Sequence, residues 1–266
     1  ALTSLTLDGE ALDLATLPTK VIDGTLCYVV TKPIAPKDGT ESFTLKATIL
    51  TDGETKTATY NLSIPKYAAK IVNNSTYDKT TQTLMRDILS YISSAMTYFD
   101  TTTNEAQKTI TDIIGESYNS GLTAADVGLD KTGTATDSGN ALSTVCLNLE
   151  ATPSFIFYLK EGKESLADTF KFTSTSGAPL TVTVKKETSG EKRTYLEVTT
   201  YAYAMGDTLT FTYTDEAGAQ TGTYHLAAYY QGETSDANLP TLLLRLAKYA
   251  QSAKTYRDSV LNLEGN

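Results

Sequence analysis

The sequence predicts an α+β protein with mainly β content, made of two related antiparallel β-sandwich modules that each end in helices. Three observations predict this fold class. Thr accounts for 47 of the 266 residues and Tyr for 17, and both residue types favour strands. Segments in which apolar residues alternate with polar ones come before segments with helical periodicity. This order of strands followed by helix occurs twice along the chain.

The first module is expected within residues 1–120. Its strands are predicted from alternating apolar residues at 2–7, 25–32, 43–49 and 57–64. Asp52-Gly53 is expected to turn the third of these strands into the fourth. A helix follows over 84–99, because Leu84, Ile88 and Ala95 form one apolar stripe, with Ser75 or Thr76 as its cap. A shorter helix is predicted over 107–114.

Residues 121–140 are rich in Gly and show little periodicity, so we expect a linker there. The second module then covers residues 141–266. Its predicted strands are 141–150, 154–159, 170–175, 180–186, 193–202, 209–213 and the run that begins at 221. A helix over 242–256 closes the module, and Asn238 followed by Pro240 is a strong start signal for it.

The chain contains an internal repeat. Residues 84–99 align without gaps on 242–257, with six identities that include Tyr91 and Tyr249. Two further pairs of segments match in the same order: 44–48 with 208–212, and 57–62 with 221–226. Three matches in one order indicate a duplicated design.

These segments resemble repeated modules of cell-surface and secreted proteins of gut Clostridia, of the Lachnospiraceae type. Residues 147–150 and 155–159 are similar to the first strand motifs of that family, and 60–68 to its strand-to-helix junction. The segments 84–99 and 242–256 resemble its closing helix, although Tyr91-Ile92 and Tyr249-Ala250 replace the Tyr-Gly of that pattern. The resemblance implies an exported bacterial surface module and supplies no catalytic residues.

Composition narrows the classes of partner. The net charge is −9, and an acidic chain is repelled by phosphate backbones and anionic lipid, so nucleic acid and membrane surfaces are poor partners. No apolar run is long enough to span a bilayer, so we expect no membrane insertion. The sequence starts at Ala1 without an initiator Met, which we interpret as a mature fragment or an excised piece from which any signal peptide is already gone. The low Cys content and the Thr-rich, Lys-poor acidic composition suit an exported Gram-positive protein. Cys27 and Cys146 are expected to be buried thiols, with a disulfide as the alternative.

The sequence offers little for catalysis. With one histidine, His225, a Ser-His-Asp triad or a histidine-rich metal site has no spare candidate, and we expect His225 at a solvated strand position. Phosphate-binding glycine motifs are absent. We therefore expect no enzyme activity, no catalytic residue, no metal and no cofactor.

The function class that remains is binding of a partner at the surface, and comparison of the two halves of the repeat indicates which residues could bind. Tyrosines found in both halves are expected to pack, whereas those found in one half are freer to bind a partner. The binding candidates are Tyr201 and Tyr203 on one face of a strand, Tyr229 and Tyr230 before the loop 232–235, and the basic residues Arg245 and Lys248 of the last helix. The predicted partner is a host protein, most specifically an immunoglobulin bound as a superantigen-like protein binds it. The alternatives are a glycan, held on Tyr201 and Tyr203, and a spacer of a cell-wall protein with no ligand.

Overall fold

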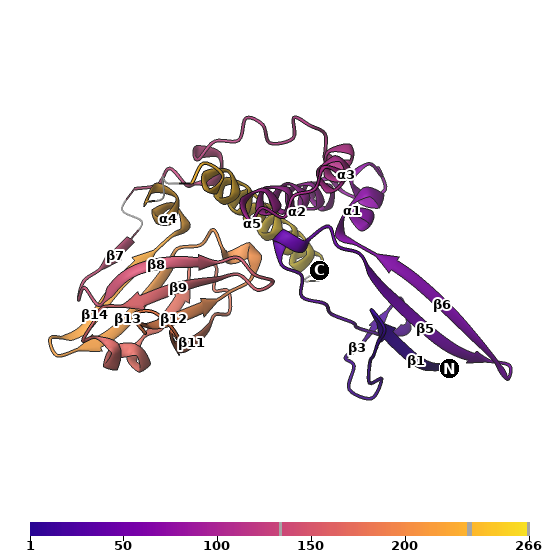
Figure 1. The fold of residues 1–266 in the computed structure, drawn as a ribbon, viewed down its shortest axis with the longest axis horizontal. Helices are drawn as coiled ribbons and strands as arrows, with labels where there is room; N and C mark the ends of the chain where they lie inside the picture. The colour runs from indigo at the N-terminus through magenta and orange to yellow at the C-terminus, as the bar shows by residue number, and fades with distance from the viewer. Residues whose placement is uncertain (133–134, 233–235, 265–266) are drawn as a thin grey trace.

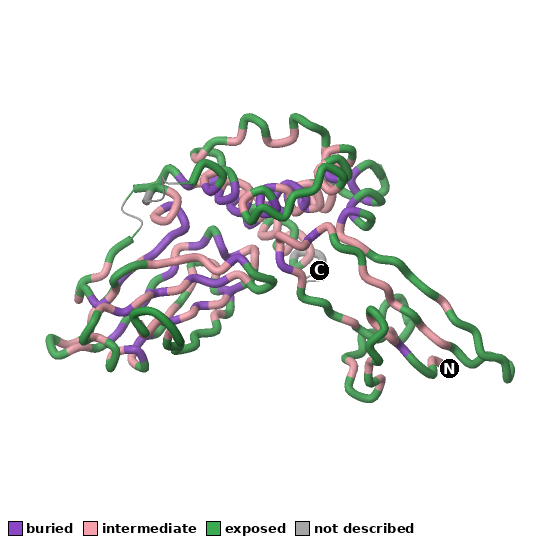
Figure 2. Tube along the Cα trace, viewed as in Figure 1, coloured by how far each residue is buried: buried purple, intermediate pink, exposed green. Residues whose placement is uncertain are grey.

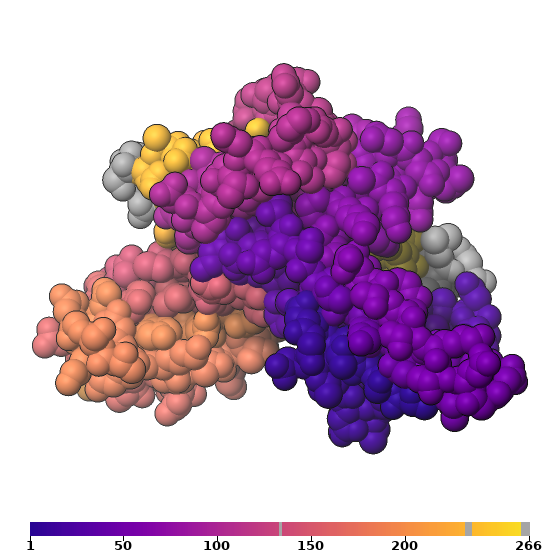
Figure 3. Space-filling view, turned by 45° about the vertical axis from the view of Figure 1, so that its right-hand side comes forward, coloured from indigo at the N-terminus to yellow at the C-terminus, as the bar shows by residue number. Residues whose placement is uncertain are grey.

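The computed structural model describes residues 1–132, 135–232 and 236–264. Within these ranges the protein is α+β, and its strands form three four-stranded antiparallel sheets and one two-stranded sheet. At this level the predicted fold class is confirmed. Figure 1 shows the helices across the top, the sheets of the second half at the lower left, and the sheet of the first half extending to the lower right. In Figure 3 the strands of the two halves form separate lobes below the helices.

One four-stranded sheet, which we call the arm sheet, consists of four strands of the first half in the order β2-β1-β5-β6. The strands of this half are β1 (Leu2–Leu7), β2 (Glu10–Ala11), β3 (Thr19–Ile22), β4 (Thr25–Tyr28), β5 (Phe43–Thr51) and β6 (Glu54–Leu62), and a 3-10 turn η1 (Pro36–Asp38) follows β4. Asp52 and Gly53 join β5 to β6 with φ angles of 51° and 81°, which confirms the predicted turn. Strands β3 and β4 form a separate hairpin, in which β4 lies within the predicted strand 25–32 and β3 was not predicted.

The arm sheet has little buried apolar surface. Leu5 and Ala35 are the buried apolar residues among positions 1–62, all of which the structure describes. Figure 2 shows this region as mostly exposed or half-buried, in contrast to the helices and the second half. The prediction of a sandwich in the first half anticipated a second sheet on this face. The described strands of residues 1–62 form the arm sheet and the β3–β4 hairpin instead.

Three helices follow the arm sheet: α1 (Ile64–Val72), α2 (Lys79–Tyr98) and α3 (Asn104–Ile114). Each begins at a side chain that accepts a hydrogen bond from the first turn: Ser63, Asp78 and Thr103. The predicted cap of α2 at Ser75 or Thr76 is wrong, because the Asn74 side chain accepts hydrogen bonds from Thr76 in a separate turn. The helices share a small apolar core that includes Ala68, Leu89 and Ile110.

The second half contains two four-stranded sheets. One has the order β10-β13-β14-β7 and the other β11-β12-β9-β8. The strands are β7 (Ala135–Asp137), β8 (Leu142–Asn148), β9 (Ser154–Leu159), β10 (Lys171–Ser174), β11 (Thr181–Lys186), β12 (Thr194–Thr199), β13 (Leu209–Asp215) and β14 (Gly218–Tyr224), with 3-10 turns η2 (Ala125–Val127), η3 (Glu164–Thr169) and η4 (Ala202–Ala204). Phe155 and Phe157 of β9 contact Phe211 and Tyr224 of the other sheet, at centroid distances of 5.4 to 6.0 Å. Aromatic rings therefore fill the space between these two sheets.

Two further helices, α4 (Leu226–Gly232) and α5 (Leu239–Glu264), end the described chain. Helix α5 packs along α2, and the rings of Tyr91 and Tyr249 stack at 5.7 Å between centroids, 20° from parallel. This contact joins two residues at equivalent positions of the repeat. It also connects the helices of the first half to the large core of the second.

The segment expected as a linker, 121–140, contributes to that core. Val127 and Leu129 are buried in it, and β7 pairs with β14. The two cysteines do not form a disulfide, and both Cys27 and Cys146 are half-buried.

Candidate binding surfaces

Tyr201 and Tyr203 lie outside the strand on which they were predicted. Strand β12 ends at Thr199, and the 3-10 turn η4 begins after Tyr201, whose carbonyl accepts a hydrogen bond from the Ala204 amide at 2.9 Å. Alternation of Tyr and Ala resembles a strand, but this local bond turns the chain. The two rings stack at 5.6 Å between centroids and 7° from parallel.

This stack presents a single aromatic ring to solvent. Tyr201 is 58% exposed, whereas Tyr203 is half-buried and the guanidinium of Arg257 lies 4.5 Å from its ring centroid. Two rings side by side would form the flat platform that a sugar chain uses. Here one ring lies on the other, so Tyr201 is the exposed contact.

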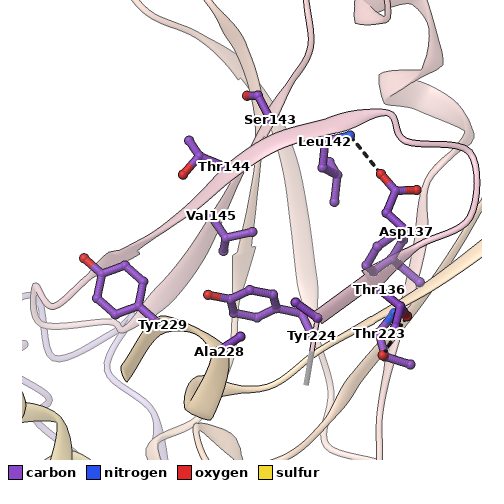
Figure 4. A pocket seen from close by; sticks show the side chains of 12 residues that line it. Thr136, Asp137, Leu142, Ser143, Thr144, Val145, Thr223, Tyr224, Ala228 and Tyr229 are labelled. Carbon is purple, nitrogen blue, oxygen red and sulfur yellow. Dashed lines mark hydrogen bonds between the residues drawn. The ribbon is translucent and has the colours of Figure 1, made fainter. Parts of the chain in front are cut away.

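Tyr229 and Tyr230 are in helix α4, where both are half-buried against the core of the second half. Gly232 of the predicted loop 232–235 ends α4, and residues 233–235 lie outside the described residues. Tyr229 lines a surface pocket of about 360 Å³ between β7, β8 and α4, which Figure 4 shows from close by. A pocket of this volume is in the range that small ligands occupy.

The pocket combines an apolar floor with hydroxyl groups. Its apolar side chains are Ala135, Leu142, Val145, Phe211 and Ala228, and its hydroxyl groups come from Thr136, Ser143, Thr144, Thr223, Tyr224 and Tyr229. Asp137 is the carboxylate of this lining. It accepts hydrogen bonds from the Tyr213 hydroxyl at 2.5 Å and from the Leu142 amide at 2.9 Å. Burial and this carboxylate raise the pKa of Tyr213 above its usual range, so the pair is a structural bond across strands.

Arg245 and Lys248 were predicted as binding residues on a basic face of α5. Arg245 instead is half-buried against α2, near Asp87, which is 1% exposed. Asp87 accepts hydrogen bonds from Tyr118 at 2.9 Å and from the Asn119 amide group at 3.3 Å. Within the described chain, Asp87 Oδ2 and Arg245 Nη1 are buried without a hydrogen-bond partner.

Burial dominates the electrostatics of this cluster. It raises the pKa of Asp87 above the usual carboxyl value and lowers that of Arg245. Lys248 lowers the Asp87 pKa in turn, and lines a shallow crevice with Ser252 and Thr80. The remaining basic residues of the face also have acidic neighbours, since Lys254 lies 3.7 Å from Asp207 and Arg257 lies 3.6 Å from Asp258.

The expectation that His225 is solvated is wrong. Its side chain is 3% exposed, and its Nδ1 accepts a hydrogen bond from the Ala227 amide at 3.0 Å. Nε2 lies 3.0 Å from the carbonyl oxygen of Gly206 and therefore donates to it. Burial lowers the pKa of His225, so the neutral ring holds the chain at the start of α4.

Strand β11 is a surface that the sequence analysis did not select. All six of its residues are exposed, and among the described strands it pairs with β12 alone. Val182 and Val184 lie on one face of this strand, which the sequence predicts over 180–186. They stand opposite Val198 and Leu196, which are fully buried, yet they are themselves 38% and 44% exposed. Sequence alternation identified the face, but its exposure depends on where the opposite sheet ends.

Comparison with protein-family models, with curated proteins and with solved structures found no match to this chain. In the part of the chain that the structure describes, no helix is both long and apolar enough to cross a bilayer. The same residues contain no cluster of three or more His, Cys, Asp or Glu side chains suited to a metal ion.

Proposed function

We propose that this chain is a non-catalytic, extracellular binding module of a Gram-positive bacterium that recognises a host protein through the open edge of β11. The observation that carries this proposal is the exposed strand itself. Val182 and Val184 are apolar and accessible on it, and its first residue pairs with Thr199, two residues before the exposed Tyr201. An open apolar edge next to an exposed Tyr suits a protein partner that adds a strand to the sheet.

Edge strands without protection are unusual in monomeric proteins, because their free amide and carbonyl groups pair with other chains. Lys185 and Lys186 at the end of β11 limit unspecific pairing and leave its first residues open. Within this class, an immunoglobulin is the specific partner we propose. Immunoglobulin domains themselves present sheet edges, and the resemblance to gut Clostridial surface proteins favours a mucosal partner.

The proposed architecture is two related modules, of which the second is a β-sandwich. Both halves have the order hairpin, short helix, long helix: β5, β6, α1 and α2 in the first, and β13, β14, α4 and α5 in the second. Equivalent side chains form equivalent bonds, since the Ser94 and Ser252 hydroxyls donate to the carbonyls of Tyr91 and Tyr249. These correspondences support a duplication, with the second module beginning at β7.

The experiment is a binding measurement on purified human mucosal immunoglobulin, with the variant Val182→Lys/Val184→Lys and with Tyr201→Ala. Loss of a central contact costs about 2 kcal/mol or more, so we expect affinity to fall roughly thirtyfold or more. Leu50→Lys/Tyr67→Lys is the matched control, because these apolar residues are also exposed and lie in the first half. Equal affinity for all variants would refute β11 as the binding edge. No binding of the wild type would refute the immunoglobulin and leave other mucosal proteins to test.

A glycan is the second candidate, and the pocket of Tyr229 is the observation that favours it. Hydroxyl groups around an apolar floor suit a sugar with one apolar face. A glycan array with the wild type and Tyr229→Ala tests this: binding lost in the variant supports the glycan. A chain that binds neither glycans nor host proteins would be the structural spacer of a cell-wall protein.

A further inference from the structure

Equivalent residues of the two halves differ sharply in exposure. On β5 and β6 of the arm sheet, Tyr60, Leu62 and Ile49 are 54%, 39% and 37% exposed. Their counterparts in the repeat, taken with the same offset as the matching segments, are Tyr224, Leu226 and Tyr213, which are 6%, 0% and 2% exposed. The arm sheet therefore exposes to solvent an apolar face whose equivalent in the second half is buried.

In the second half, β9 covers Tyr224, and the ring of Phe170, just before β10, stacks on Tyr213 at 4.4 Å. Phe155 and Phe157 contact Tyr224 across the gap between the sheets at 5.8 and 5.4 Å. Strand β9 is held there by pairing with β12, with Phe157 opposite Leu196 and Phe155 opposite Val198, and β8 pairs on its other side.

The order of strands shows what the first half lacks. Strands β10, β11–β12 and β13–β14 of the second half correspond in order to β1, β3–β4 and β5–β6 of the first, including a hairpin between the flanking strands. Strands β8 and β9 precede β10 in the chain. Residues 1–62 contain no counterpart of β8 or β9, and β4, which corresponds to β12, pairs with β3 alone among the described strands.

We propose that the apolar face of the arm sheet is the docking site of a two-stranded segment equivalent to β8–β9, contributed by the part of the polypeptide that directly precedes residue 1. One strand of this segment pairs with the free edge of β4, as β9 pairs with β12. Its apolar side chains cover Ile49, Tyr60 and Leu62. Leu26 and Val21 of the hairpin, 64% and 62% exposed, become part of the same core.

The proposed segment does not include a strand equivalent to β7. Strand β7 approaches β14 at Gly222, where a Cβ atom would lie 2.3 Å from the Thr136 carbonyl oxygen. The equivalent residue on β6 is Ala58, which has that Cβ atom. The edge of β6 therefore does not accept a strand in the way that β14 accepts β7.

The experiment compares residues 1–266 with the same chain extended at its N-terminus by its native preceding residues, over a length equal to the segment from Leu142 to Phe170. Hydrogen exchange is measured at the amides of β4, β5 and β6. In the extended chain we expect exchange at these strands to slow by about tenfold or more, because their edge and face become covered. Binding of an apolar dye by the shorter chain should be lost on extension. Amides of β13 and β14, which β9 already covers, are the internal control.

The change in melting temperature caused by one substitution should also depend on whether the chain is extended. Ile49→Lys places a charge on an exposed position of residues 1–266, so we expect little change in the melting temperature there. In the extended chain the same charge is buried, and we expect a clear loss. The equivalent change in the second half, Tyr213→Lys, should destabilise both proteins.

Three results would overturn the proposal. The first is unchanged exchange and dye binding on extension. The second is a gene in which no strand-forming segment precedes residue 1. The third is a dimer of residues 1–266 that Ile49→Lys dissociates, because the occupant of the face would then be a second copy of the chain.

Discussion

Gly222 is the position at which one added methyl group should be most informative. It lies on β14 opposite Phe211 of β13 and next to β7. A Cβ atom at this residue would lie 2.2 Å from Phe211 Cζ and 2.3 Å from the carbonyl oxygen of Thr136. Carbon atoms in contact are normally about 3.5 to 4.0 Å apart, so Gly222→Ala requires movement of at least one neighbour.

Neither neighbour moves easily. Phe211 is 1% exposed and its ring contacts Phe157, Phe170 and Phe172, while the Thr136 oxygen belongs to the backbone of β7. Overpacking of this kind costs about 1 to 3 kcal/mol. Since each kcal/mol shifts the melting temperature of a domain of this size by about 2 to 4 °C, we expect Gly222→Ala to lower it by roughly 2 to 12 °C.

A double-mutant cycle measured by thermal unfolding separates the two contacts. The first half has Ala47 opposite Ala58 where the second has Phe211 opposite Gly222. Phe211→Ala alone should cost about 3 to 5 kcal/mol because a fully buried ring is lost. In that background Gly222→Ala should cost less than in the wild type, since one of its two clashes is gone. Additivity of the two changes within about 0.5 kcal/mol would refute this packing argument.

Three further predictions concern buried groups of the helices and of the aromatic core. His225→Asn introduces the residue found at the equivalent position 61. Burial lowers the His225 pKa, so the wild type loses stability as the pH falls below about 6.5. The variant should not show this loss, which thermal melts at pH 7.5 and 5 will measure. Parallel slopes for both proteins would contradict this. For Asp87→Asn we expect the opposite pH dependence of stability. Because the Asp87 pKa is raised, the wild type gains stability relative to the variant as the pH falls from neutral through that pKa. Urea unfolding midpoints measure this, and a constant difference between them would show that Asp87 is not the titrating group. Phe157→Ala should cost about 3 to 5 kcal/mol in chemical unfolding because its ring fills the space between the two sheets, and a loss under 1 kcal/mol would mean that the sheets do not pack through it.

Much of the fold was predictable because its signals are local. Strand β9 has the predicted limits, and the Asp52-Gly53 turn and the start of α5 after Asn238 are as expected. Each of these features depends on residues within a few positions of one another. Strand β4 lies within the predicted strand 25–32, whereas β3 and β7 were missed because they are short and their residues do not alternate clearly.

The candidate site was less predictable because exposure is decided by distant segments. The pattern around Val182 and Val184 indicates an apolar face, but the extent of the opposite sheet leaves it open. Arg245 looks like a solvated charge until α2 brings Asp87 beside it. His225 resembles a surface residue because Asn occupies the matching position, and its burial depends on Gly206, nineteen residues away in the chain. Tyr201 and Tyr203 alternate as strand residues do, and a single backbone bond turns them onto one another.

The electrostatic influence of Asp87 on Arg245 has a consequence for how the two copies of the repeat differ. Under the two-module proposal these residues occupy the same place in the two copies, on helices that meet at the Tyr91–Tyr249 stack. Two identical subunits related by a twofold axis must present the same residue at that place, and two like charges there repel. An acidic and a basic residue at equivalent positions are therefore possible only where the two copies differ in sequence. Under the two-module proposal, the contact between α2 and α5 is one that a symmetric dimer of a single copy could not form.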